Sequence, residues 1–338
     1  QAREIHTEKR MIVFSGISPK STASDHSFKA VYELWFEKWQ HEVTERYAKQ
    51  QNGLVQKHCM KHLAKLQVCD IDSSHIYKAL QEIEKTGSLS QIRRAKNALS
   101  AVFKFAAQLN LCRFDPTSLI TANAFKKHIE KPHRSLPLNE IYKLHELFQD
   151  VSIDLTTRNA IQMTVRSMLR LQEVTMMRWS YINEKEKIIV IPKSVMKTKK
   201  AAHVVPITSE IQMILDEQSN DSKFVFPRNS QESIPKYRLT RTFNELGIDT
   251  TTHGLRHLAS TILNEFRDDD GITRLIDSDL VEKSLAHAGK DKIRNVYNLA
   301  DYIEPRRAML VKWSDFIDKC DTKENNEKAL KEAGISLI

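Results

Sequence analysis

The sequence is poor in glycine, aromatic residues and cysteine, and it contains no long apolar run. Because no eighteen consecutive residues are apolar, we expect no membrane-spanning helix. The polar first residues also contain no apolar signal-peptide segment. With only 8 glycines and 7% aromatic residues, but many Leu, Lys and Glu, the composition favours a mainly helical protein.

The cysteines are too scattered for a zinc site or a disulfide scaffold. They are Cys59, Cys69, Cys112 and Cys320, and no two have the close spacing of a metal-binding pair. We therefore expect reduced and mostly buried thiols, with no bound metal and no cofactor.

Length and charge indicate two domains and an anionic partner. At 338 residues, the chain is long enough for two domains that each have a core. Its 52 Lys and Arg exceed its 43 Asp and Glu, which gives a formal net charge of +9. A moderate basic excess is typical of surfaces that bind nucleic acid or anionic membranes.

The first half of the chain has the apolar spacing of a helical domain. Residues 1–20 are mostly polar and are interpreted as an N-terminal remnant or linker. Helical spacing of apolar residues then predicts a helical domain over 21–124. The apolar stripes of its four predicted helices begin at Phe28, Leu54, Ile76 and Ile92.

Basic residues occur on the last of these helices and in the segment that follows the domain. Arg93, Arg94 and Lys96 lie outside the apolar stripe. Taken alone, they are more typical of a solvated helix face than of DNA contact. They are nevertheless the candidate DNA-binding residues of this domain. Residues 125–134 form a basic linker that could follow a phosphate backbone.

Residues 135–319 form a second predicted domain of mixed helix and strand, followed by a charged, weakly helical tail at 320–338 with an apolar end. The predicted helices are 138–148, 157–179, 209–218, 236–246, 253–266, 279–286, 291–302 and 304–318. Two predicted β-strands, 187–192 and 203–207, flank a Lys-rich turn.

The first turn of the helix predicted from residue 253 has residues suited to anion binding. Thr251 and Thr252 offer capping hydroxyls, which places His253 and Arg256 on one face of the first turn. A helix N-terminus that carries an imidazole and a guanidinium is suited to hold an anion. By itself, however, this pattern favours a buried helix whose His and Arg only cap and pair.

Four further segments of the chain, taken together with this one, form a recognisable series of motifs. They are Met168-Leu169-Arg170-Leu171-Gln172-Glu173, then Met196-Lys197-Thr198-Lys199 before a Val205-Pro206 strand, then Leu285-Ala286-His287, and then Tyr297. In this order and spacing, the five segments resemble the motifs of the tyrosine recombinases (phage integrases). The run from Leu285 to Met309 resembles the satellite-phage and genomic-island branch, and the resemblance covers nearly the whole chain from Phe28 to Ile317.

The resemblance implies a phosphate-cleaving site. Its catalytic set would be Arg170, Lys197, His253, Arg256, His287 and Tyr297, with Glu173 supporting. Metal-free cleavage of a phosphodiester needs cations around the nonbridging oxygens, and guanidinium groups donate paired hydrogen bonds at any working pH. Glu173 would buttress a guanidinium, although an ordinary helical salt bridge would also explain it.

Two assignments keep alternatives. Lys197 would protonate the leaving 5′-oxygen, provided that neighbouring arginines lower the pKa of its amine. Lys199 is the rival and would otherwise contact DNA, while all the lysines of this turn could simply be solvated. Tyr297 would be the nucleophile. The alternative is that Tyr297 is a structural tyrosine at the edge of a core, a description that fits Tyr302 better.

The fold implied is mainly α with a small β-sheet: a helical core-type DNA-binding domain plus an α+β catalytic domain, forming a C-shaped clamp on DNA. The implied partners are the double-stranded core of an attachment site, a homo-tetramer on two duplexes, and accessory DNA-bending or directionality proteins, with no membrane. We expect the bacterial cytoplasm, near the nucleoid. The branch usually carries a further N-terminal arm-binding domain, of which 1–20 would be the exit.

The implied activity is integration or excision of a mobile element through a 3′-phosphotyrosine intermediate. A type IB-like topoisomerase and a non-catalytic DNA-binding regulator are the alternatives. Two departures from the family pattern concern the backbone: Ala286 replaces a frequent glycine, and the residues around Arg170 lack the usual Gly or Pro. The tail 320–338 is expected to pack on a neighbouring protomer.

Overall fold

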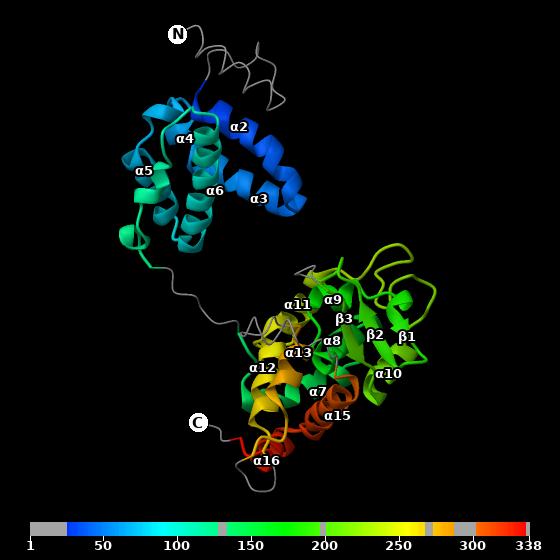
Figure 1. Cartoon of the computed structure of the whole chain (residues 1–338). Coiled ribbons are helices and arrows are strands. Elements are labelled where there is room, and N and C mark those ends of the chain that lie inside the picture. The colour runs from blue at the N-terminus through cyan, green and yellow to red at the C-terminus, as the bar shows by residue number, and fades with distance from the viewer. Residues whose placement is uncertain (1–25, 128–133, 197–200, 268–272, 287–301, 336–338) are drawn as a thin grey trace. The chain divides into compact units, whose positions relative to one another are not determined.

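The computed structural model describes residues 26–127, 134–196, 201–267, 273–286 and 302–335 (Figure 1). The chain divides into two compact units, Gln1–Lys131 and Pro132–Ile338. Each unit has a hydrophobic core of its own. Among the described helices, none has the length and apolar character needed to cross a bilayer.

The first unit is a helical bundle in which α6 packs against α2, α3 and α5 (Figure 1). Its helices and 3-10 turns are α2 (Phe28–Trp39), η1 (Gln40–Glu42), α3 (Glu45–His58), α4 (Met60–Leu63), η2 (Val68–Asp70), α5 (Ser73–Lys85), α6 (Leu89–Gln108), η3 (Pro116–Leu119) and η4 (Ala122–Ala124). The buried rings of Phe28 and Phe103 lie 5.8 Å apart and join α2 to α6. Burial of such apolar faces is what stabilises the bundle.

Local capping explains where these helices begin. Asp72 starts α5, because its side chain accepts from the backbone N–H groups of Ser74 and His75 at 2.9 and 3.1 Å. The second helix begins earlier than predicted from its stripe at Leu54. Thr44 caps α3 by accepting from the N–H of Tyr47 at 3.4 Å, so the helix includes a polar first turn.

The second unit combines helices with a small antiparallel sheet. Its helices and turns are η5 (Leu138–Glu140), α7 (Tyr142–Gln149), α8 (Leu155–Ser167), α9 (Leu171–Thr175), η6 (Trp179–Tyr181), α10 (Ser209–Asp216), α11 (Lys236–Glu245), α12 (Thr252–Glu265), α13 (Ser278–Ser284), α15 (Ile303–Lys319) and α16 (Lys323–Glu332). The strands are β1 (Ile182–Asn183), β2 (Ile188–Ile191) and β3 (His203–Pro206), in the order β1-β2-β3. Both predicted strands are confirmed. They pair in a register that places Ile191 opposite His203.

The single helix predicted from Thr157 to Trp179 is wrong. Helix α8 ends at Ser167, and Met168 adopts a left-handed backbone with a φ of 57°. Such a conformation costs a non-glycine residue roughly 1–2 kcal/mol, so the surrounding core must impose it. Met168 is fully buried in that core. The chain therefore turns here without the glycine or proline that usually marks such a break.

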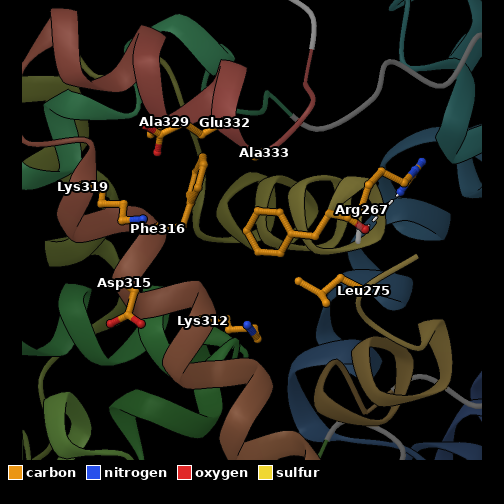
Figure 2. A pocket seen from close by; sticks show the side chains of 10 residues that line it. Arg267, Leu275, Lys312, Asp315, Phe316, Lys319, Ala329, Glu332 and Ala333 are labelled. Atoms are coloured by element: carbon orange, nitrogen blue, oxygen red, sulfur yellow. Dashed lines mark hydrogen bonds between the residues drawn. The ribbon is translucent and has the colours of Figure 1, made fainter. Parts of the chain in front are cut away.

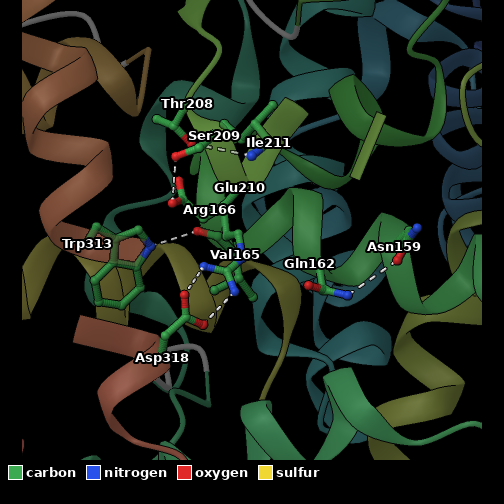
Figure 3. Close-up of polar contacts among 10 residues, drawn as sticks. All are labelled: Asn159, Gln162, Val165, Arg166, Thr208, Ser209, Glu210, Ile211, Trp313 and Asp318. Atoms are coloured by element: carbon green, nitrogen blue, oxygen red, sulfur yellow. Dashed lines mark hydrogen bonds and ion pairs between the residues drawn. The ribbon is translucent and has the colours of Figure 1, made fainter. Parts of the chain in front are cut away.

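Helix α15 is fixed to α8 by two polar contacts that Figure 3 shows in close-up. Arg166 forms a bidentate pair with Asp318, from Nη1 to Oδ2 at 3.0 Å and from Nη2 to Oδ1 at 2.6 Å. The Trp313 indole donates to the carbonyl oxygen of Val165 at 2.8 Å. The Arg166 guanidinium is buried at this contact.

The tail folds onto its own unit as far as it is described. The Asn326 amide of α16 donates to the carbonyl oxygen of Leu138 at 2.9 Å, and its oxygen accepts from the N–H of Tyr142 at 3.1 Å. Leu330 is buried as well. The tail from 323 to 335 is thus part of the core of this unit. Its packing on a neighbouring protomer stays a prediction. Residues 336–338 lie outside the described residues.

Between α12, α15 and α16 lies a cavity of about 250 Å³ (Figure 2). Its lining is Phe266, Arg267, Leu275, Lys312, Asp315, Phe316, Lys319, Ala329, Glu332 and Ala333.

Fewer cysteines are buried than the sequence predicts. All four are free thiols, but only Cys59 and Cys320 are buried.

Candidate active site

Arg170 lies directly after the backbone turn at Met168. It is the N-cap residue of α9, and its backbone N–H donates to Glu173 Oε2 at 2.9 Å. Its Nη1 donates to the other carboxylate oxygen, Oε1, at 3.2 Å. Glu173 is buried, whereas the Arg170 side chain is partly exposed. The carboxylate therefore orients a guanidinium that remains accessible on its other side.

Arg256 reaches the same place from helix α12. It is only 3% exposed, and its guanidinium donates to the carbonyl oxygen of Met168 and to that of Leu285, the latter at 2.6 Å. Its buried Nε has no partner among the described residues. Burial, followed by repulsion from Arg170, lowers the pKa of Arg256 to about 10, and attraction to Glu173 opposes this shift.

The two arginines share one acceptor segment at the end of α13. Arg256 bonds the carbonyl of Leu285, and Arg170 bonds the next one, that of Ala286, at 3.2 Å. Ala286 has a left-handed backbone with a φ of 47°, the conformation for which glycine is usual. The departure from the family pattern therefore keeps the geometry at the cost of some backbone strain. The result is two guanidinium groups held at consecutive carbonyls, one of them paired with Glu173, an arrangement that suits a bound phosphate.

The beginning of α12 is also built as expected, with Thr251 as its N-cap, accepting from the N–H of Gly254 at 2.9 Å. His253 lies in the first turn and its side chain is exposed. The chain that enters this unit crosses the same turn: Ser135 donates to the Gly254 carbonyl at 3.2 Å, and Thr251 donates to that of Arg134 at 3.4 Å. The helix N-terminus and His253 thus lie beside the incoming chain.

Gly254 permits this close approach. A Cβ at this position would lie 1.9 Å from the carbonyl oxygen of Arg134, a distance no side chain can tolerate. The glycine of the His-Gly-Leu-Arg segment is therefore explained by backbone packing.

His203 belongs to this group of residues, although the sequence analysis does not select it. It lies on β3, is 5% exposed, and its Nε2 has no partner among the described residues. Burial, then repulsion from Arg306, Arg256 and Arg170, lowers the pKa of its imidazole to about 3, against a hydrogen bond to the Ser284 backbone. The ring is therefore neutral at physiological pH. The two-residue period shared with buried Val205 is the signal that could have identified it.

The residues predicted to bind DNA in the first unit behave differently from one another. Arg93 is exposed on α6. Arg94 lies over the ring of Tyr47, 5.6 Å from its centre. Lys96 donates to the carbonyl oxygen of Ile120 and so fixes the end of η3. Of the three, Arg93 is the one best placed to meet a phosphate, whereas Lys96 has a structural contact.

Comparison with known proteins identifies the family. Residues 28–123 match the phage integrase central domain, and residues 134–302 match the phage integrase family. The chain is 31% identical to prophage integrase IntZ of Escherichia coli K12 over 337 residues, covering 94% of this chain and 80% of IntZ. The chain belongs to the phage integrase family. A second relative is the integrase of Shigella phage Sf6, 25% identical, with 94% of this chain and 83% of that protein covered.

Solved structures confirm the integrase fold. A lambda integrase tetramer bound to a Holliday junction has a TM-score of 0.63 at 14% identity, covering 85% of this chain and 86% of that one. The Tn1549 transposon integrase (residues 82–397) in complex with circular intermediate DNA has a TM-score of 0.57 at 14% identity, covering 84% and 99%. The predicted fold class, mainly α with a small sheet, is therefore confirmed.

The remaining predicted site residues of this integrase lie outside the described residues. They are Lys197, Lys199, His287 and Tyr297. Two of these residues directly follow described ones: buried Met196 precedes Lys197, and Ala286 precedes His287. Tyr302, the residue that better fits a boundary position, is 37% exposed at the N-cap of α15. In the described part of the chain, no cluster of three or more His, Cys, Asp or Glu could hold a metal.

Proposed function

We propose that this integrase cuts and rejoins DNA at a specific site through a 3′-phosphotyrosine intermediate, and so integrates or excises a mobile element. One observation carries the proposal: Arg170 and Arg256, from distant parts of the chain, bond the consecutive carbonyls of Leu285 and Ala286. His287, the third expected phosphate ligand, is the next residue in the sequence. The family membership supports a recombinase over a topoisomerase or a non-catalytic regulator.

The proposed chemistry is a transesterification. The Tyr297 phenolate would attack phosphorus in line, forming the Tyr–O–P bond as the bond from phosphorus to the 5′-oxygen breaks. Lys197 would give its proton to that leaving oxygen, and His253 would assist removal of the phenol proton. Arg170, Arg256 and His287 would stabilise the charge on the nonbridging oxygens. The ester retains the bond energy, so religation needs neither metal nor ATP.

The proposed assembly follows the relatives. A core-binding domain at 21–124, a basic linker at 125–134 and a catalytic domain at 135–319 would close as a C-shaped clamp on the duplex, with a tail at 320–338. Four protomers would act on two duplexes, assisted by DNA-bending or directionality proteins, in the bacterial cytoplasm. A lambda integrase tetramer on a Holliday junction is the structural precedent for such an assembly. Exposed Arg93 is the first-unit residue we assign to phosphate contact.

A nicked suicide substrate that contains the attachment core tests the proposal. Such a substrate traps the covalent protein–DNA adduct, because the short strand diffuses away after cleavage. We expect an adduct with the native chain and with Tyr302→Phe, and none with Tyr297→Phe. An adduct that persists in Tyr297→Phe would contradict the nucleophile assignment, and the absence of any adduct would favour the regulator. Strand exchange between two cores, measured against supercoil relaxation, then separates recombinase from topoisomerase.

A further inference from the structure

Arg306 is a fully buried arginine near the beginning of α15, with an exposed fraction of 0%. Its Nε donates to the hydroxyl oxygen of Ser284 at 2.9 Å, and its Nη1 donates to the carbonyl oxygen of Val204 at 2.8 Å. Removing a guanidinium from water is costly, so a buried arginine needs hydrogen-bond acceptors around it. These two bonds leave from different nitrogens of one planar guanidinium and reach two separate elements, α13 and β3.

The three segments that Arg306 joins are those that lead to the expected catalytic residues. Val204 lies on β3, directly after the turn that contains Lys197. Ser284 ends α13, from which the chain continues to His287. Arg306 itself follows the segment that contains Tyr297. One side chain of the third segment therefore bonds to the described ends of the other two.

Ser284 connects this junction to the arginine clamp. Its hydroxyl accepts from Arg306, and its backbone bonds the buried ring of His203, the residue before Val204. The next two carbonyls along the chain are those held by Arg256 and Arg170. The stretch 284–286 is thus bonded on one side to the clamp and on the other to β3 and α15.

We infer that Arg306, acting through Ser284, is a positioning residue of the cleavage reaction: it fixes β3 and α13 relative to each other, and with them the described ends of the segments that carry Lys197 and His287 in the sequence. It does so without contacting DNA. The inference rests on the proposed function, because it concerns the placement of the general acid. If so, loss of the paired N–H donors of the Arg306 guanidinium impairs proton delivery to the 5′-oxygen more than it impairs phosphate binding.

Arg307 provides a matched control on the same turn of α15. Its Nη1 donates to the carbonyl oxygens of Lys187 and Ile207, at 3.0 and 2.5 Å. These residues flank the opposite end of the β2–β3 pair, where Ile188 lies opposite Pro206. Substitution of Arg307 therefore also disturbs contacts between α15 and the sheet, but at the end of the sheet away from residues 191–203.

The test compares two suicide substrates that differ in one atom. In the first, the scissile phosphate has its natural 5′-oxygen; in the second, sulfur replaces that oxygen. A thiolate leaves without protonation, so cleavage of the second substrate does not need a general acid. The native chain, Arg306→Lys, Ser284→Ala and Arg307→Lys are compared by the rate of adduct formation on each substrate, by DNA affinity and by thermal unfolding.

A lysine cannot reproduce these paired donors, so Arg306→Lys should cleave the oxygen substrate roughly 10- to 100-fold more slowly than the native chain. Its rate on the sulfur substrate and its DNA affinity should remain close to native. Ser284→Ala should show the same pattern more weakly, and it decides the matter if Arg306→Lys does not fold. Arg307→Lys should cleave both substrates at native rates.

Two results would overturn the inference. Equal losses on both substrates would show a general structural role, and native rates for Arg306→Lys and Ser284→Ala on the oxygen substrate would show no role. Failure of the proposed function has a different signature, because the native chain would then form no adduct on either substrate.

Discussion

Arg256 donates from Nη2 to the carbonyl oxygen of Leu285 at 2.6 Å, although the two residues are 29 positions apart. This bond fixes the guanidinium with a neutral acceptor. A carboxylate in its place would cancel the charge that a phosphate needs, whereas a carbonyl dipole leaves it available. Among the described residues, Glu173 is the carboxylate that contacts the clamp, and it bonds Arg170.

Substitution of either clamp arginine by lysine should impair chemistry much more than binding. A lysine keeps the charge but loses the planar pair of donors, so a nonbridging oxygen loses a preorganised hydrogen bond in the transition state. We expect Arg170→Lys and Arg256→Lys each to slow adduct formation by about 10²- to 10³-fold. Adduct formation on the nicked substrate and DNA affinity in a gel-shift assay measure the two effects.

Arg178→Lys is the control for this prediction. Arg178 follows the same motif, but its guanidinium lies 5.4 Å from the centre of the Phe224 ring rather than in the clamp. Its cleavage rate should remain within a few-fold of native. Equal losses in all three variants would show that the clamp assignment is wrong.

Gly254→Ala should destabilise the protein and slow cleavage. The new methyl group would occupy the position of the Arg134 carbonyl, 1.9 Å away, so either the entering chain or the first turn of α12 must move. Overpacking of this kind costs about 1–3 kcal/mol, and the displaced turn carries His253 and Arg256. Chemical denaturation gives the change in the free energy of unfolding.

Gly53 offers the matched comparison. It lies within α3, and a Cβ there would meet no heavy atom within 4 Å. Gly53→Ala should therefore stabilise the protein by about 0.5–1 kcal/mol, since alanine loses less backbone freedom on folding. If both alanine variants shift stability in the same direction, close approach is not the reason for Gly254.

Much of the fold could be predicted because its causes are local. The strands at Ile188–Ile191 and His203–Pro206 follow from β-branched runs, and the caps Asp72 and Thr251 follow from side chains that bond the next turn. Tertiary structure overrides such signals at Met168. No local residue favours its left-handed φ of 57°, so the pattern there predicts a continuous helix.

The candidate site was predictable as a set of residue types and not as a geometry. Arg170, Glu173 and Arg256 could be chosen from their segments, but their meeting at the carbonyls of Leu285 and Ala286 depends on contacts between distant parts of the chain. Arg306, by contrast, could not be chosen from its sequence segment. It occurs in an ordinary charged sequence, and only the folded structure shows that it is buried.

The neutral imidazole of His203 should make the stability of the protein depend on pH. The pKa of His203 falls to about 3 in the folded protein, against an ordinary value of 6.5. Below pH 6.5 the unfolded chain therefore binds a proton that the folded protein does not, and stability is lost as pH falls towards 3. The slope attributable to this residue approaches ~1.4 kcal/mol per pH unit in that range.

His203→Gln isolates this contribution, because glutamine keeps polar atoms in place but does not titrate. Urea denaturation of both proteins between about pH 5 and pH 7 avoids most carboxylate titration. The native chain should lose more stability over this range than the variant. Parallel curves would show that His203 titrates normally or is protonated when folded. Other histidines contribute equally to both proteins and cancel.

The pair between Arg166 and Asp318 should contribute substantially to stability, because the guanidinium side of it is buried. Asp318→Asn removes the carboxylate that Arg166 bonds beside the Phe148 ring, whose centre is 5.6 Å away, and leaves the guanidinium with the longer-range attraction of Glu210. Because Asp318 itself is about half exposed, we expect a loss of about 1–3 kcal/mol rather than the full cost of a buried unpaired charge. Thermal and urea unfolding measure it, and cleavage by the folded protein should be unchanged.

The exposed pair between Arg241 and Glu245 of α11 is the matched control, with its two side chains 71% and 56% exposed. Solvent screens this pair, so Glu245→Gln should cost less than about 0.5 kcal/mol. Added salt should weaken the small effect at Glu245 further, while it changes the effect at Asp318 little. A loss at Asp318 no larger than that at Glu245 would mean that α15 is held to α8 by its apolar contacts and by Trp313, without help from the ion pair.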